Sequence, residues 1–293
     1  MSSRQKTIHL FLMDGEANGR IKCTMANWTG LAYKIPRTDI ELCKNRSDLN
    51  QSGVYFLFGT TNETDEKTVY VGQAGLRKNK EGILNRLIEH KRDPSKDYWT
   101  EAIAFTTSNN SFGPTEISYL ENRFCNMAID SKRYIVKNGN DPNPGNLTEE
   151  KECELEEFID YARIIMGALG HKVFIPINES DNEQITEEKP VRTEPLLFIK
   201  NKKVNASGKR TSDGFILLKG SLVSKEPSTK CEKNILNLRA KHFNKVDKVS
   251  NILLEDILFS SPSYAAAFVF YRSANGLREW KNEEGISLKE LEN

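Results

Sequence analysis

Short apolar runs with β-branched or aromatic character predict strands in the first half of the chain. The polar segment after SGVYFLFG separates it from KTVYVGQAG, so these two runs predict an antiparallel hairpin. The runs that predict strands cover residues 5–12, a strand and a connection within 21–36, residues 52–59 and 67–75, and residues 98–108.

Apolar residues at helical spacing predict three clear helices and one shorter one. The clear helices cover residues 81–93, 114–130 and 148–170, and Gly170 is a typical end signal for the last. Residues 37–49 predict a short helix, which Asp39 could cap. Residues 171–177 (HKVFIPI) again resemble a short strand.

The pattern breaks at residues 178–195, which are polar and acidic with Ile185 as the one large apolar residue, and this composition indicates a linker. We therefore expect a leader at 1–50, a first domain at 51–177 and a second domain at 196–293. In the second domain, residues 213–223 predict a strand pair. A helix in 260–274, a turn at Asn275-Gly276 and a Trp-containing strand are expected to follow. The expected fold class is α+β: a small mixed or antiparallel sheet flanked by helices, plus a smaller α+β domain.

Composition narrows the function classes. The 293 residues carry a net charge of +1, and the sequence contains no run of eighteen apolar residues, so we expect a cytoplasmic protein without a membrane partner. The five cysteines are scattered without CxxC spacing, which argues against a disulfide framework or a zinc site.

Charge is unevenly distributed. Residues 200–250 contain thirteen Lys or Arg against four Asp or Glu, which favours phosphate binding by the second domain. A solvated basic face or a flexible arm remains the alternative. Lys200 and the candidate substrate-binding residues Lys202, Lys203, Lys209 and Arg210 cluster in sequence at the start of this segment.

Candidate chemistry is concentrated in the first domain. The hairpin brings Tyr55 and Tyr70 onto adjacent strands, and Arg86 and His90 are four residues apart on the next helix, so they share a face. Glu121 lies in a later helix. A single carboxylate suits Mg²⁺, which retains most of its water ligands.

These residues, in this order, resemble the signature of the GIY-YIG nuclease superfamily. The two tripeptides are Gly53-Val54-Tyr55 and Tyr70-Val71-Gly72, with Val for Ile in both. TIHLFL-DG, NWTG at 27–30 and IPR at 35–37 resemble the leader of one bacterial branch. DGFILLKGS at 213–221 and SPSYAAAFVFYRSANG at 261–276 resemble a small C-terminal domain of unknown function that is often attached to it.

The resemblance implies a one-metal hydrolysis of phosphodiester bonds. Glu121 would hold Mg²⁺ or Mn²⁺, Arg86 would bind the scissile phosphate, and a tyrosine, with Tyr55 favoured over Tyr70, would help to deprotonate the attacking water. Gly72 belongs to the implied substrate surface. Asn138 and Asn140 both fit the family's asparagine, and Asn140 is favoured. Gln73 stands where some members carry a lysine, so His90 becomes the candidate for activating a tyrosine.

The expected function is therefore a metal-dependent DNA endonuclease acting in restriction, phage defence or repair. Its expected partner is double- or single-stranded DNA, and a homodimer or a defence-complex partner remains open. The alternative is a nucleic-acid-binding protein that retains the nuclease fold but does not cleave.

Overall fold

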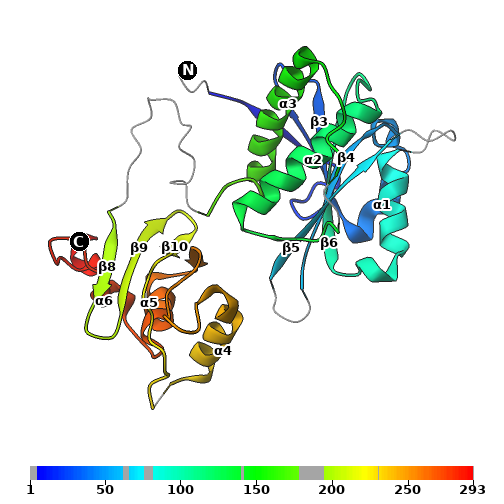
Figure 1. Cartoon of the computed structure of the whole chain (residues 1–293). Helices are drawn as coiled ribbons and strands as arrows, with labels where there is room; N and C mark the ends of the chain where they lie inside the picture. Colours follow the sequence, from blue (N-terminus) through cyan, green and yellow to red (C-terminus); the bar gives the residue numbers. More distant parts are fainter. Residues whose placement is uncertain are drawn as a thin grey trace. The chain divides into compact units, whose positions relative to one another are not determined.

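The computed structural model describes residues 5–61, 66–75, 82–139, 142–177, 195–229 and 231–292. The chain divides into two compact units, one within residues 2–176 and the other within residues 177–293 (Figure 1). Asn140 and nearly all of the expected linker lie outside the described residues.

A mixed sheet forms the centre of the N-terminal unit. Within the described residues it has seven strands in the order β1-β2-β3-β6-β4-β5-β7, and every neighbouring pair is antiparallel except the parallel pair β5 and β7. The predicted α+β class and the hairpin are confirmed. The strands are β1 (Ile8–Leu12), β2 (Ile21–Met25), β3 (Gly30–Pro36), β4 (Gly53–Thr60), β5 (Lys67–Ala74), β6 (Trp99–Thr107) and β7 (Ile135–Val136).

Much of the expected leader is built into this sheet. Strand β3 pairs with β6 along its whole length, from Gly30 opposite Thr107 to Pro36 opposite Glu101. The helix expected at 37–49 is instead two 3-10 helices, η1 (Arg37–Cys43) and η2 (Ser47–Asn50). Ile40 and Cys43 are buried three residues apart, which matches the three-residue turn of a 3-10 helix. Asp39 lies inside η1 and caps nothing.

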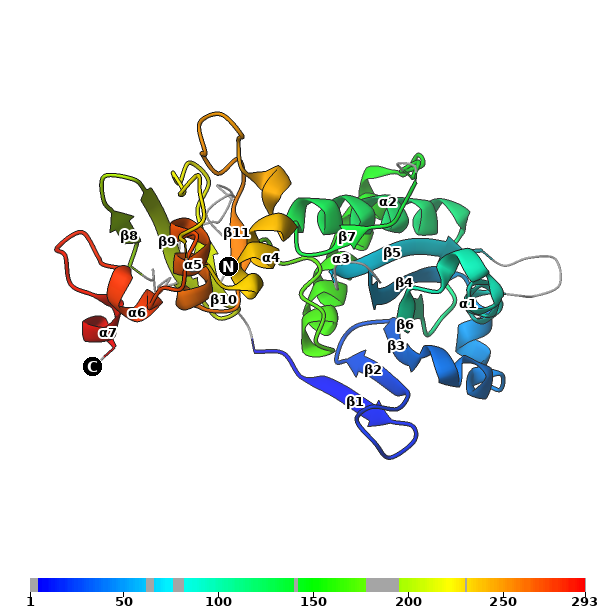
Figure 2. The same cartoon turned by 90° about the horizontal axis from the view of Figure 1, so that it is seen from below.

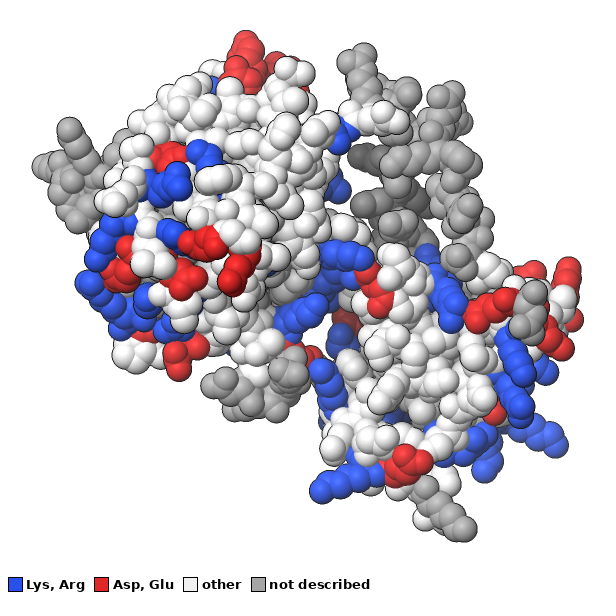
Figure 3. Space-filling view, turned by 180° about the vertical axis from the view of Figure 1, so that it is seen from behind, with Lys and Arg blue, Asp and Glu red and all other residues white. Residues whose placement is uncertain are grey.

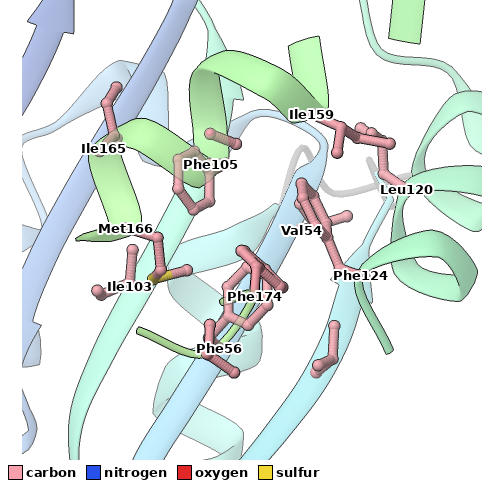
Figure 4. Packing of buried hydrophobic residues seen from close by; sticks show 14 of the residues in the cluster. Val54, Phe56, Ile103, Phe105, Leu120, Phe124, Ile159, Ile165, Met166 and Phe174 are labelled. Atoms are coloured by element: carbon pink, nitrogen blue, oxygen red, sulfur yellow. The ribbon is translucent and has the colours of Figure 1, made fainter. Parts of the chain in front are cut away.

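Helices cover both faces of the sheet. Helix α1 (Ile83–Arg92) covers one face, and α2 (Pro114–Ser131) and α3 (Glu149–Ala168) cover the other (Figures 1 and 2). Because side chains alternate along a strand, Val54, Phe56 and Phe58 of β4 pack toward α2 and α3 (Figure 4). Tyr55 and Leu57 point to the opposite face, into the cluster that contains the buried residues of α1.

The strand expected at 171–177 is wrong. This segment forms turns, and its apolar residues fill the core from an irregular backbone. Val173 and Phe174 are buried, and the Phe174 ring stacks on Phe124 with 5.2 Å between centroids. The apolar character of this segment reflects this packing.

The C-terminal unit contains an antiparallel sheet, which within the described residues has four strands in the order β11-β10-β9-β8. Its strands are β8 (Leu197–Lys200), β9 (Asn205–Thr211), β10 (Gly214–Leu217) and β11 (Ile257–Phe259). Its helices are α4 (Lys233–Lys241), α5 (Pro262–Phe270), α6 (Gly276–Glu279) and α7 (Leu288–Leu291), and it also contains the short 3-10 helix η5 (Phe243–Lys245). A further 3-10 helix, η3 (Pro94–Lys96), belongs to the N-terminal unit.

Two expectations for this unit are corrected. Residues 213–223 supply one strand, because β10 pairs with the preceding β9 rather than with Leu222. Asn275 caps the start of α6 instead of forming the expected turn before a strand, and Trp280 follows that helix. The Trp280 ring is buried 4.5 Å from that of Phe215, which accounts for its apolar surroundings without a strand.

Candidate active site

The hairpin places Tyr55 directly opposite Gly72. A Cβ atom at position 72 would lie 2.4 Å from the Tyr55 hydroxyl oxygen and 2.5 Å from its Cζ atom, closer than real Cβ contacts allow. The Tyr55 ring therefore lies over the bare backbone of β5. This close approach explains why the second tripeptide contains a glycine on the face that carries the tyrosines.

Tyr55 and His90 form a buried pair. The Tyr55 hydroxyl oxygen is 2.7 Å from His90 Nε2, and these side chains belong to residues that are 0% and 3% exposed. The half-buried Tyr70 ring lies beside both, with its centroid 6.3 Å from that of Tyr55 and 5.5 Å from that of His90. Of the two tyrosines, Tyr70 is the one that reaches solvent.

Burial controls the protonation of this cluster. It raises the pKa of Tyr55 above its usual value and also raises that of Tyr70. Burial, with the positive charges of Lys96 and Arg86, lowers the pKa of His90 to about 4. All three groups are therefore neutral at pH 7, and His90 does not give the unliganded site a tyrosine of lowered pKa.

Glu121 joins the site from α2. Gln73 Nε2 donates to Glu121 Oε2 over 2.9 Å and also lies 3.2 Å from the Ser118 hydroxyl. Burial raises the pKa of Glu121, while the hydrogen bonds from Gln73 and the charge of Arg86 oppose that rise. Gln73 thus orients the carboxylate, and it does so from the position at which some members of the GIY-YIG superfamily carry a lysine.

Two cations complete the cluster. Arg86 forms an ion pair with Glu89 at 2.7 Å and is partly exposed, and its charge affects the pKa of Tyr55, Tyr70 and Glu121. Lys96 lies with its Nζ atom 3.6 Å from the Tyr70 ring centroid. Sequence reasoning missed Lys96, because it ends a three-residue 3-10 helix that belongs to no recognisable motif.

Asn138 has a structural role that the sequence did not indicate. The Val71 amide donates to Asn138 Oδ1 over 3.0 Å, and Asn138 Nδ2 donates to the Val71 carbonyl over 2.8 Å. Strand β7 pairs only with Thr68 and Val69, so the Asn138 side chain continues the pairing along the edge of β5 beside Gly72. The favoured Asn140 lies outside the described residues.

The basic candidates of the C-terminal unit separate into two groups. Lys202 and Lys203 are exposed in the turn before β9, whereas Lys209 and Arg210 lie near its other end. Six strand residues span roughly 20 Å, so these groups do not form one cluster. Arg210 is paired with Glu292. In Figure 3, the Lys and Arg side chains visible on this unit, at the lower right, are dispersed among Asp and Glu.

The buried His90 predicts a pH-dependent stability. Its folded-state pKa of about 4 lies below the unfolded value near 6.5, so unfolding takes up a proton between these values. Stability is retained above pH 6.5 and falls as the pH is lowered, by about 2 kcal/mol at pH 5. Urea denaturation of the wild type and of His90→Gln at pH 6.5 and 5 measures this contribution.

We expect His90→Gln to lose less stability than the wild type over this range. His9→Gln, which replaces an exposed histidine of β1, should keep the wild-type dependence. Equal pH dependence in the wild type and His90→Gln would show that His90 is not held neutral.

Comparison with known proteins identifies the C-terminal unit. Residues 197–292 match a family described as a domain of unknown function, DUF4357, in agreement with the small C-terminal domain expected from the sequence. The match does not extend to residues of the N-terminal unit. No match was found among curated proteins or among solved structures.

Among the helices of the described residues, none combines the length and apolar character needed to cross a membrane.

Proposed function

We propose that the N-terminal unit is a metal-dependent endonuclease of the GIY-YIG type that hydrolyses phosphodiester bonds in DNA. One observation carries the proposal: two strands and two helices bring Tyr55, Tyr70, Arg86, His90 and Glu121 into one cluster, in which their charges influence one another. Each of these residues taken alone is common on strands and helices. Their convergence, in the order of the superfamily signature, supports a phosphate-cleaving site.

The donor set fits a hard divalent cation that keeps most of its waters. Glu121 is one carboxylate with one oxygen bonded to Gln73, and no group of three or more acidic, His or Cys side chains suited to a metal occurs among the described residues. Mg²⁺, or Mn²⁺ in its place, would be held by Glu121 and would stabilise negative charge on the phosphate.

The other side chains of the site have separate roles in the proposed reaction. Arg86 binds the scissile phosphate and offsets the negative charge that develops on it. Tyr70 is the accessible phenol and orients the attacking water, and Lys96 Nζ lies 3.6 Å from the centroid of its ring. Tyr55 and His90 are buried and act as positioning residues, because their hydrogen bond holds β4 against α1 beneath the site. Gln73 fixes the Glu121 carboxylate.

Cleavage by the wild type is the direct test. Supercoiled plasmid, linear DNA and single-stranded DNA are incubated with the full chain in Mg²⁺, in Mn²⁺ and in EDTA, and nicked and linear products are resolved on gels. We expect cleavage with either metal and none in EDTA. Stable DNA binding with no cleavage in either metal would instead support the non-cleaving alternative.

Loss of Arg86 should slow cleavage strongly. We expect Arg86→Ala to reduce the cleavage rate about 100-fold, because removing one preorganised donor to a developing charge has costs of this size. Arg92→Ala is the matched control, since Arg92 lies on the same helix with its side chain 75% exposed. Equal loss in the two variants would indicate a general charge effect, and an unchanged rate in Arg86→Ala would remove this residue from the site.

A further inference from the structure

The C-terminal unit contains a cavity with an unusual arginine in its lining. The cavity measures 590 Å³, within the size range of small-molecule sites, and is lined mainly by residues of α4, η5 and the turns around them. Its charged and aromatic lining residues are Lys225, Arg239, Phe243, Asp247, Lys248 and Tyr271.

Arg239 is buried without an acidic partner. The residue is 9% exposed, its Nη1 atom has no hydrogen-bond partner, and no Asp or Glu pairs with it among the described residues. One other guanidinium nitrogen, Nη2, donates to the Ser224 carbonyl. A buried cation without an acidic partner is costly, so an anion in the cavity that Arg239 lines would offset part of this cost.

Aromatic rings fix the guanidinium in place. Its Cζ atom lies 4.5 Å from the Phe268 ring centroid and 4.8 Å from that of Tyr271, so the planar group packs against two rings. Burial lowers the pKa of Arg239 to about 10, which leaves it charged at neutral pH. The arginine is therefore a rigid, charged donor before any ligand arrives.

The rim adds positive charge and an exposed ring. Lys248 Nζ lies 5.0 Å from the centroid of Phe243, a residue that is 59% exposed. The acidic residue of the lining, Asp247, is already engaged: its Oδ1 accepts hydrogen bonds from the Val249 and Ser250 amides and from the Ser250 hydroxyl. The cavity thus offers cationic donors inside and a planar apolar surface at its mouth.

We propose that this cavity binds a nucleotide, with the phosphate on Arg239 and the base against the aromatic rim. Arg239 lines the cavity, and a guanidinium is a charged donor that phosphate oxygens accept well. Phe243 offers a face on which any base can stack. The ligand is either a free nucleotide or one unit of a single strand, since both present this chemistry. The site is independent of the proposed nuclease centre.

Calorimetric titration of the full chain in EDTA tests the proposal. The probes are AMP, adenosine, inorganic phosphate and a single-stranded DNA tetranucleotide. We expect AMP to bind, phosphate to bind more weakly and adenosine to bind most weakly. A tetranucleotide that binds no tighter than AMP identifies a free nucleotide as the ligand, and one that binds at least tenfold tighter identifies a single strand.

Two variants test whether Arg239 is responsible for nucleotide binding. Arg239→Met should weaken AMP binding about tenfold or more, the loss expected for a charge-assisted hydrogen bond. Arg278→Gln, which removes an exposed arginine of α6 outside the cavity, should leave the affinity unchanged. Absent AMP binding in the wild type, or equal affinity in the wild type and Arg239→Met, would overturn the proposal.

A second variant covers the case in which Arg239→Met does not fold. Lys248 is exposed at the rim, so Lys248→Ala preserves the core and should weaken AMP binding about threefold by removing one nearby charge. An unchanged AMP affinity in Lys248→Ala would then count against the site. None of these outcomes alters the metal-dependent cleavage expected of the N-terminal unit.

Discussion

Glu121→Gln should reduce metal-dependent DNA cleavage about 1000-fold or more. The substitution keeps the size of the side chain but removes the charge that would hold the cation, and metal-ion stabilisation of the transition state is worth several kcal/mol. No group of three or more acidic, His or Cys side chains suited to a metal occurs among the described residues, so no such group is at hand to replace Glu121. Plasmid nicking rates in Mg²⁺, measured over long incubations, give the ratio.

Two measurements separate a lost metal ligand from a damaged fold. DNA affinity in EDTA should be the same for Glu121→Gln and the wild type, because the phosphate contact proposed for Arg86 does not depend on the metal. Asp130→Asn, which removes an exposed carboxylate from the same helix, should cleave at the wild-type rate. Wild-type cleavage by Glu121→Gln would refute the assignment of this residue to the metal.

Gly72→Ala should destabilise the N-terminal unit by about 3 kcal/mol or more. The added Cβ would lie 2.4 Å from the hydroxyl oxygen of Tyr55, whose ring is fully buried and bonded to His90. Because neither the strand backbone nor the ring can move freely, the change resembles overpacking of a filled core. Urea denaturation of the full chain measures the loss, and cleavage should fall with it because Tyr55 supports the site.

A nearby glycine provides the control. At Gly75 an added Cβ would lie 3.6 Å from the Ile117 Cδ1 atom, an ordinary contact, so Gly75→Ala should have little effect on stability. A double-mutant cycle adds a sharper check: Gly72→Ala should cost much less when Tyr55 has already been replaced by Ala. The same cost in both backgrounds would mean that the clash with Tyr55 is not the cause.

The sequence predicted the hairpin and the main helices because their signals are local. The continuous apolar run of β4 and the helical spacing in α1, α2 and α3 are each determined by residues close together in the chain. The segment at 171–177 was mistaken for a strand, because burial against the distant Phe124 produced the same apolar pattern. Periodicity reports burial and cannot by itself distinguish a strand from a packed turn.

The candidate site was predictable to the extent that its residues belong to an ordered motif. Tyr55, Tyr70, Arg86, His90 and Glu121 were selected from their types and order, and the structure brings them close together. Lys96 could not be selected in this way, because it acts through a tertiary contact with the Tyr70 ring. Asn138 fits the family's asparagine, but its pairing with the Val71 backbone is a tertiary contact that the sequence does not show. The neutral state of His90 likewise follows from burial, which the sequence pattern does not show.

The two hydrogen bonds between Asn138 and Val71 also disfavour self-association of the protein through the edge of β5. An amide and a carbonyl left open on a sheet edge form a template on which a second polypeptide can add as a further strand. With both groups of Val71 occupied by one side chain, this part of the edge offers no template. The edge of β5 beyond its pairing with β7 is therefore less able to add a strand from a second copy of the protein.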